Sequence, residues 1–241
     1  MYLRAVIIVL VAGCGRIGFD EDEIDDSGGS LEADLVAHYL MEDTAGSMRL
    51  TDSSGHGLDG ACNGGSACFA VVPGIAGNAV QVTGPGTVLV PDDPLLHLTT
   101  GFTVSIWLQR INGTTPISKP HLMGDGPAFE IVTGPTGVSF CTLDTLAVAT
   151  SSCISTNQPL AMPWAHVAVT WDGTEKILYV EGTERLSELA GTMFDASPLS
   201  IGSDFTGGAL SSQFTGAIDN VRIYSRALAP VEVAAIFARR L

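Results

Sequence analysis

The sequence predicts an all-β fold in which two antiparallel sheets pack as a sandwich, with a short helix at the C-terminal end. Hydrophobic residues make up 46% of the chain and charged residues 15%, which is typical of a chain that buries a core. The 28 glycines and 12 prolines indicate many turns. Between the turns lie short runs of β-branched and aromatic residues, several of them alternating in polarity as half-buried strands do. Strands are expected at Leu35–Leu40, Ala79–Val82, Thr87–Val90, Phe102–Arg110, Phe129–Thr133, Val138–Cys141, Ala165–Trp171, Ile177–Val180, Leu199–Gly202 and Ala217–Tyr224.

Two local signals support this order of elements. Asp172-Gly173 follows a strand and predicts a tight turn, because glycine accepts the positive φ that such turns require. Pro230 stands at a first-turn position before Val231–Phe237, which favours a helix there. No internal repeat is visible, and one sandwich accounts for every expected strand. We therefore expect a single domain over residues 35–241.

The charge of the chain excludes one class of partner. The formal net charge is −15 with only 11 Lys and Arg residues, so no basic face is available for nucleic acid phosphates. Acidic residues are concentrated between Asp20 and Asp34, around the Gly/Ser segment Ser27–Ser30. Such a segment could attract cations or a basic partner, but charged Gly/Ser-bearing segments commonly act as flexible spacers. We predict a linker over residues 14–34.

The N-terminal segment resembles a bacterial lipoprotein signal. Arg4 precedes the apolar run Ala5–Ala12, which is too short to span a bilayer and typical of a secretory signal. The run ends at Val11–Cys14, which is similar to the lipobox, where the cysteine is acylated and becomes the first residue after cleavage. The resemblance implies a signal peptide over residues 1–13 and a lipid anchor at Cys14; the alternative is an ordinary signal peptide with an incidental cysteine. Because Gly15, and not Asp, follows the cysteine, we expect an exported protein anchored in the outer membrane.

The cysteine count agrees with export. Of five cysteines, four remain after Cys14 is set aside, and an exported chain is in a compartment that permits disulfides. Four cysteines allow three pairings. We favour the two local pairs, Cys62–Cys68 and Cys141–Cys153, because each would close a loop or hairpin. A metal site is the weaker alternative, since neither pair has metal-ligand spacing and no histidine is close in sequence.

Six segments in order are similar to the laminin-G-like jelly rolls of the concanavalin A-like class. The resemblance covers nearly all of residues 35–238 and implies two antiparallel sheets in a jelly roll. It implies much less about activity, because this architecture carries lectins, adhesion modules, enzymes and spacers. The segments are Leu35–Glu42 (LVAHYLME), Asp52–Gly57 (DSSGHG), Gly74–Val80 (GIAGNAV), Gly101–Leu108 (GFTVSIWL), Trp164–Gly173 (WAHVAVTWDG) and Phe214–Leu228 (FTGAIDNVRIYSRAL).

The same resemblance implies one structural Ca²⁺. Asp52 and Asp219 match positions where the family often holds this ion, with Glu42 as a further ligand. Ca²⁺ binds six to eight oxygens, which carboxylates and exposed carbonyls such as that of Gly57 supply. The alternative is that Asp52 caps its own turn and Asp219 binds a backbone amide.

Catalytic patterns are not found. Related glucanases carry carboxylates spaced along one strand, and the nearest acid cluster here, Glu181, Glu184 and Glu188, is expected on a turn and an irregular stretch. No G-x-S-x-G segment accompanies the histidines. His166 is expected to pack beside a core tryptophan, and the tryptophans, Trp107, Trp164 and Trp171, are expected to be structural. We therefore expect a protein that is not an enzyme.

The predicted function is a membrane-anchored binding or adhesion module for carbohydrate or extracellular protein. Its ligand would be bound by loops at one rim of the sandwich, because loops on a rigid scaffold commonly carry function. The Gly/Ser/Thr-rich segments Ile111–Gly126 and Phe205–Gln213 are the candidates. The alternatives are an envelope spacer without a dedicated ligand and, less favoured, a polysaccharide-active enzyme.

Overall fold

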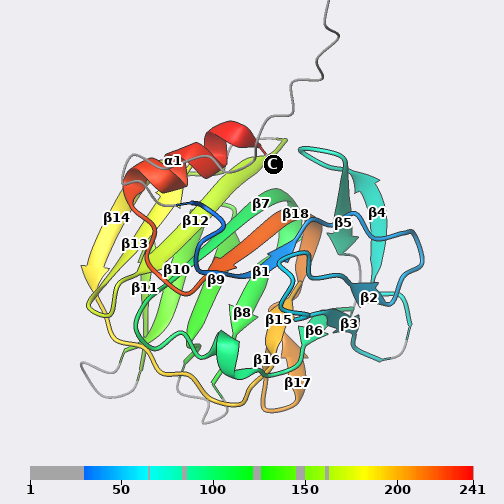
Figure 1. Cartoon of the computed structure of the whole chain (residues 1–241), viewed down its shortest axis with the longest axis horizontal. Helices are drawn as coiled ribbons and strands as arrows, with labels where there is room; N and C mark the ends of the chain where they lie inside the picture. Colours follow the sequence, from blue (N-terminus) through cyan, green and yellow to red (C-terminus); the bar gives the residue numbers. More distant parts are fainter. Residues whose placement is uncertain are drawn as a thin grey trace, which may run out of the picture.

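A computed structural model describes residues 30–64, 66–82, 86–121, 126–144, 150–160 and 163–240. The predicted signal peptide, Cys14 and residues 14–29 of the predicted linker lie outside these ranges. Within them the chain forms two large antiparallel sheets and a short C-terminal helix (Figure 1), which confirms the expected jelly-roll sandwich. No helix in the described ranges has the length and hydropathy that a membrane span needs.

The first sheet joins both ends of the described chain. Strand β18 lies near its middle and pairs with β7 on one side and with β5 and β1 on the other. In the order β14-β13-β12-β7-β18-β5-β4, with β1 beside β18, its strands are Thr183–Leu189, Glu175–Val180, Ala165–Trp171, Phe102–Gly113, Phe214–Tyr224, Asn78–Val82, Phe69–Pro73 and, for β1, Leu35–Tyr39.

The second sheet faces the first and contains several strands that the sequence pattern missed, because they are short or polar. The missed strands include β8 and β11 in this sheet and β4 and β14 in the first. In the order β11-β10-β9-β8-β15-β6-β3-β2, the strands of the second sheet are Thr150–Ser155, Gly137–Asp144, Phe129–Gly134, Ile117–Lys119, Leu199–Ile201, Val88–Val90, Gly60–Cys62 and Arg49–Leu50.

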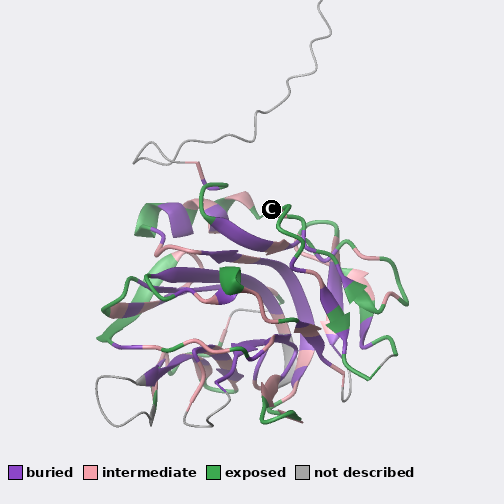
Figure 2. Cartoon of the chain, turned by 60° about the horizontal axis from the view of Figure 1, so that its bottom comes forward, coloured by how far each residue is buried: buried purple, intermediate pink, exposed green. Residues whose placement is uncertain are grey.

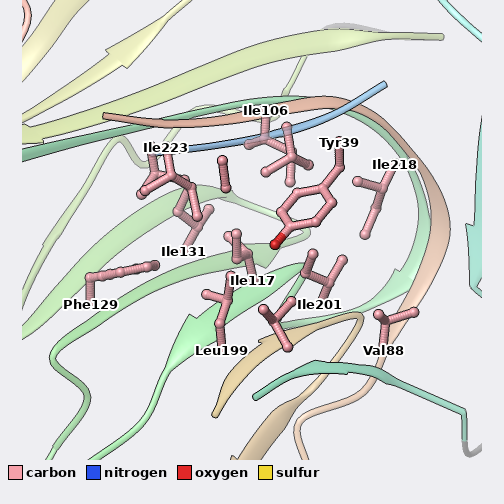
Figure 3. Packing of buried hydrophobic residues seen from close by; sticks show 14 of the residues in the cluster. Tyr39, Val88, Ile106, Ile117, Phe129, Ile131, Leu199, Ile201, Ile218 and Ile223 are labelled. Carbon is pink, nitrogen blue, oxygen red and sulfur yellow. The ribbon is translucent and has the colours of Figure 1, made fainter. Parts of the chain in front are cut away.

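The main core fills the space between the two sheets. Figure 3 shows side chains from both sheets in this layer, with Ile106, Ile218 and Ile223 of the first sheet near Ile117 and Ile131 of the second. These inward residues alternate with outward ones along each strand, as a sandwich requires. Figure 2 shows buried residues along the strands and exposed residues mainly in turns and in the edge strand β14.

The helix closes a second, smaller core on the outer face of the first sheet. Helix α1 spans Pro230–Arg239, which confirms the helix expected after Pro230. Figure 1 shows it across the strands β12–β14. Val233 and Ile236 pack against Ala168, Tyr179 and Tyr224 of the sheet.

Both predicted disulfides are present. Cys62 bonds Cys68, and Cys141 bonds Cys153 across the neighbouring strands β10 and β11. Each closes a short stretch of chain and so lowers the conformational entropy of the unfolded state, which stabilises the fold by about 2–3 kcal/mol.

Candidate functional site

The two segments predicted to be ligand-binding loops are partly regular and lie side by side. Residues 111–126 contain the end of β7 and all of β8, so the expectation of an unpatterned loop was wrong there. Residues 205–213 form most of a separate hairpin, β16 (Asp204–Thr206) and β17 (Ala209–Ser211), whose turn uses the positive φ angles of Gly207 and Gly208. Thr115 bridges to Gln213, which fixes the hairpin beside the start of β8 (Figure 1).

This junction gathers polar side chains on the outer face of the second sheet. We name Thr115, Ser118, Glu130 and Asp204 the outer polar cluster. Glu130 points outward because its neighbours Phe129 and Ile131 point into the core. Ser118 pairs in register with Glu130 on β9 and with Ser200 on β15. Ser118 and Glu130 therefore lie side by side in one row across the sheet, and Thr115 and Asp204 contact this pair through hydrogen bonds.

Hydrogen bonds hold the two carboxylates of the cluster. The Thr115 hydroxyl donates to Oε1 of Glu130 at 2.7 Å, and the Ser118 hydroxyl donates to Oδ1 of Asp204 at 3.1 Å. Thr206 and Ser211 of the hairpin donate to the other oxygen of Asp204. Oε2 of Glu130 has no hydrogen bond to another described residue, so it is available to a ligand.

The electrostatics of the cluster follow from burial. Thr115 and Ser118 are buried, and Glu130 and Asp204 are half-buried. Burial raises the pKa of Glu130 to about 7, and the nearby charge of Asp204 also raises it, while the Thr115 hydrogen bond acts in the opposite direction. A carboxyl group that is half protonated near neutral pH both donates and accepts hydrogen bonds. It therefore suits hydroxyl groups, which also do both.

The residues predicted for calcium divide between two loops, of which the first is the Asp52 loop. Backbone N–H groups of His38, Ser54 and Leu58 and the Ser54 hydroxyl all donate to the Asp52 carboxylate, at 2.8–3.0 Å. These four bonds use the lone-pair sites of the carboxylate, and they lower its pKa against the effect of burial. Gly57 lies in the same loop with a φ of 75°. The geometry of Asp52 is that of a loop cap.

Asp219 and Glu42 instead meet at the turn before β5. Oδ2 of Asp219 accepts from Ile75 N–H at 2.8 Å, and Glu42 binds the backbone N–H and side-chain amide of Asn78. Burial raises the pKa of Asp219 to about 6, the charge of Glu42 adds to this, and backbone N–H donors oppose it. Oδ1 of Asp219 is buried without a hydrogen-bond partner.

That buried oxygen fits a cation, because Ca²⁺ binds carboxylate oxygens and would remove the cost of the unpartnered atom. Asp219 and Glu42 are the residues that would hold it. No group of three or more His, Cys, Asp or Glu side chains in the described ranges is placed to bind one ion, so further ligands would be backbone carbonyls or water. The calcium site stays a prediction.

The remaining candidates have structural surroundings. Glu184 and Glu188 lie on the strand β14 and not on an irregular stretch, which corrects that expectation; Glu188 accepts a hydrogen bond from Ser152. His166 packs beside Trp107 at a ring distance of 5.2 Å, as expected. Its Nε2 lies 2.9 Å from the Ser105 hydroxyl, and burial lowers its pKa to about 3. Trp171 is buried and donates to the Ala190 carbonyl.

The sequence pattern did not reveal the outer polar cluster. Glu130 is a single outward acid on an alternating strand, which normally indicates a solvated position. Asp204 lies 86 residues from its partner Ser118. No spacing along the chain links residues so far apart, so only the pairing of the strands brings them together.

The chain belongs to a laminin-G-like family within the concanavalin A-like lectin/glucanases superfamily, whose model matches residues 83–234. No curated protein sequence matches the chain significantly.

Solved structures with the same fold include two kinds of protein. The binding domain of Paraclostridial Mosquitocidal Protein 1 superposes with a TM-score of 0.65 at 17% identity, over 86% of this chain and 52% of that one. Domain 4 of AbnA, a GH43 extracellular arabinanase from Geobacillus stearothermophilus solved with arabinotriose, gives 0.64 at 22% identity, over 84% and 97%. The binding domain of botulinum neurotoxin DC, solved in complex with SialylT, gives 0.63 at 13%, over 88% and 53%. This chain spans about half the length of the toxin binding domains.

Proposed function

We propose that this protein is a cell-envelope binding module that binds carbohydrate at the outer polar cluster. The observation that carries the proposal is the placement of Glu130 and Asp204 beside one another on the outer face of the second sheet. Thr115 orients one oxygen of Glu130, and its Oε2 remains available. Carboxylates held this way form strong hydrogen bonds with the hydroxyl groups of a sugar. Ser139 and Ser155, half-buried on the neighbouring strands, extend the polar surface.

The structural neighbours support a binding role over a catalytic one. They are carbohydrate- and protein-binding domains, solved with arabinotriose, with SialylT and, in another neurotoxin DC complex, with rat synaptotagmin II. We favour carbohydrate because the outer polar cluster offers carboxylates and hydroxyls, which complement the hydroxyl groups of a sugar.

We also propose where the protein is located in the cell. Cys14 would carry the lipid anchor in the outer membrane, and the acidic residues 14–34 would hold the domain away from the bilayer. An anchored module needs no catalytic groups, and we propose that the protein is not an enzyme.

The experiment is a glycan and matrix-protein binding screen with the purified full-length chain, repeated with Glu130→Gln and Asp204→Asn. We expect carbohydrate binding that weakens about tenfold in either variant, because each loses a charge-assisted hydrogen bond. Glu184→Gln, the same substitution at an exposed position of the edge strand β14 in the other sheet, is the matched control. Glycan binding that is equal in all four proteins would refute the site. No binding to any probe would favour the envelope spacer.

A further inference from the structure

A second concave site lies on the opposite side of the sandwich, where the chain leaves β18 and enters α1. It is a half-open pocket of about 440 Å³. Its floor is the outer face of β12 and β13, with Thr170, Ile177 and Tyr179. Its walls are residues 226–230 with Glu232 on one side, and on the other Asp172 of the β12–β13 turn and Glu175 at the start of β13.

The only cation in the lining is already neutralised. Arg226 makes a fork of two hydrogen bonds to the Glu232 carboxylate, at 2.7 and 2.5 Å, and its Nε lies 3.3 Å from Asp34. The same Glu232 carboxylate accepts from Ala229 N–H. With three carboxylates and one guanidinium in the lining, the pocket has a net negative charge. An anionic ligand would meet no available cation.

The groups that remain available are acceptors and hydroxyls. The carboxylate of Glu175 has no hydrogen bond or ion pair to another described residue. Oδ1 of Asp172 accepts three hydrogen bonds, from the N–H and hydroxyl groups of Thr174 and from the N–H of Glu175. Its Oδ2 accepts no hydrogen bond from a described residue. Ile177 and Leu228 add an apolar surface between these oxygens.

The hydroxyl group of Tyr179 gives separate evidence for a ligand. Its side chain is fully buried, it lines the pocket, and its hydroxyl has no hydrogen-bond partner in the described structure. Burial raises the pKa of Tyr179, the nearby Thr170 side chain lowers it without reaching the geometry of a hydrogen bond to the hydroxyl, and the carboxylates of Glu184 and Glu175 raise it. A buried hydroxyl without a partner is rare in native proteins and is commonly completed by a bound molecule or ion.

We propose that this pocket binds a protonated primary amine that carries a short apolar stem. The ammonium group has three N–H donors and no acceptor, which complements oxygens of Glu175, Asp172 and Tyr179. The stem would lie on Ile177 and Leu228. A lysine side chain, an alkyl diamine and an amino sugar share this chemistry. This site is separate from the outer polar cluster.

The test is NMR titration of the uniformly labelled full-length chain with Nα-acetyl-lysine amide, putrescine and glucosamine. Each is compared with a counterpart that lacks the ammonium charge: Nα,Nε-diacetyl-lysine amide, 1,4-butanediol and N-acetylglucosamine. We expect saturable shifts at Thr170, Ile177 and Leu228 for at least one amine and none for its counterpart. The amine that saturates first identifies the source.

Variants make the assignment specific. Glu175→Gln should weaken amine binding by about tenfold or more, and Tyr179→Phe by a few-fold, because charged hydrogen bonds contribute more than neutral ones. Asp93→Asn removes one negative charge outside the pocket lining, at a cap position that asparagine also fills, and should leave amine binding unchanged. Equal shifts with the neutral counterparts, equal binding in Glu175→Gln, or no saturation below about 10 mM by any amine would each overturn the proposal. A failure here leaves the glycan site untouched, because the pocket is tested by shifts at its own lining residues and by Glu175→Gln and Tyr179→Phe, whereas the glycan site is tested by Glu130→Gln and Asp204→Asn.

Discussion

The pKa of Glu130 shows how the position of one residue in the fold changes its chemistry. Its strand neighbours Phe129 and Ile131 fill the core, so its carboxyl group lies against the sheet and loses water. Burial, with the charge of Asp204, raises its pKa to about 7. An ordinary glutamate is fully ionised well below that pH. The folded chain therefore holds a proton here that the unfolded chain releases.

This difference predicts a pH dependence. Because the pKa of Glu130 is higher in the folded than in the unfolded state, its contribution to stability falls as the pH rises from about 4.5 to about 7. Glu130→Gln removes that loss. The melting temperature of the variant minus that of the wild type should therefore increase between pH 5 and pH 8, as measured by circular dichroism at matched ionic strength. A difference that is constant with pH would contradict the raised pKa.

The melting temperature of the variant must be compared with that of the wild type at each pH, because other buried groups also change protonation between pH 3 and pH 7. Burial lowers the pKa of His38 to about 4 and that of His166 to about 3, so both contribute stability that increases as the pH rises towards the unfolded value of 6.5. Asp219, with a pKa raised to about 6, acts in the same direction as Glu130. These contributions cancel when the variant is compared with the wild type.

At the scale of an element, helix α1 depends on one glutamate at its start. The N-cap residue is Ala229, which has no side-chain oxygen to accept from the first turn. Glu232 substitutes in part: it is buried, accepts from Ala229 N–H and pairs with Arg226. The helix in turn covers Tyr179 and Tyr224 on the first sheet. Stability of the helix and closure of the smaller core are therefore coupled.

Glu232→Ala should lower the free energy of unfolding by about 3 kcal/mol, since it leaves the half-buried Arg226 without its fork and one backbone N–H without its acceptor. Urea unfolding followed by tryptophan fluorescence measures the change. Val231→Ala, at an exposed position of the same turn, is the control and should cost less than about 0.5 kcal/mol. Similar losses in both variants would show that Glu232 is not special.

At the scale of the whole molecule, aromatic packing joins the two sheets. Phe102 of β7 lies 5.2 Å from the ring of Phe129 and 6.2 Å from that of Phe140, which belong to the opposite sheet. It also contacts Trp171 and Phe194. Phe102 is fully buried, so no water replaces these contacts when the ring is removed.

Phe102→Ala should therefore lower the free energy of unfolding by about 4 kcal/mol in urea titrations, through lost burial and the cavity that remains. The half-exposed Phe205 of the β16–β17 hairpin provides the comparison, and Phe205→Ala should cost about 1 kcal/mol or less. If the two costs were equal, the packing of Phe102 between the sheets would not be a principal source of stability.

A calcium ion at Asp219 and Glu42 would also act on the whole molecule, because it would link the last strand to the turn before β5. We expect EDTA to lower the melting temperature by on the order of 5 °C, and added Ca²⁺ to restore it, since a ligand that binds only the folded state stabilises it. Asp219→Asn should lose this response and Asp52→Asn should keep it. A melting temperature that EDTA leaves unchanged would exclude the ion.

The sequence by itself determined the fold class, most of the central strands, the terminal helix and the local disulfide pairs. These features depend on patterns within a few residues: alternation in Phe102–Leu108, Pro230 before an apolar run, and cysteines separated by 6 and 12 positions. Short or polar strands such as β8, β14 and β16 were missed, because neighbouring strands and not local preference hold them.

Only the tertiary structure decided the sites. The outer polar cluster joins Ser118 and Glu130 to Asp204, and the pocket joins the β12–β13 turn to residues 226–232. The structure also showed that the two predicted calcium ligands differ. The Asp52 carboxylate accepts hydrogen bonds from neighbouring backbone N–H groups, whereas the buried Oδ1 of Asp219 has no hydrogen-bond partner. The physical reason is that a site depends on burial and on distances between side chains. Strand pairing sets both across long separations in sequence, where no periodic pattern records them.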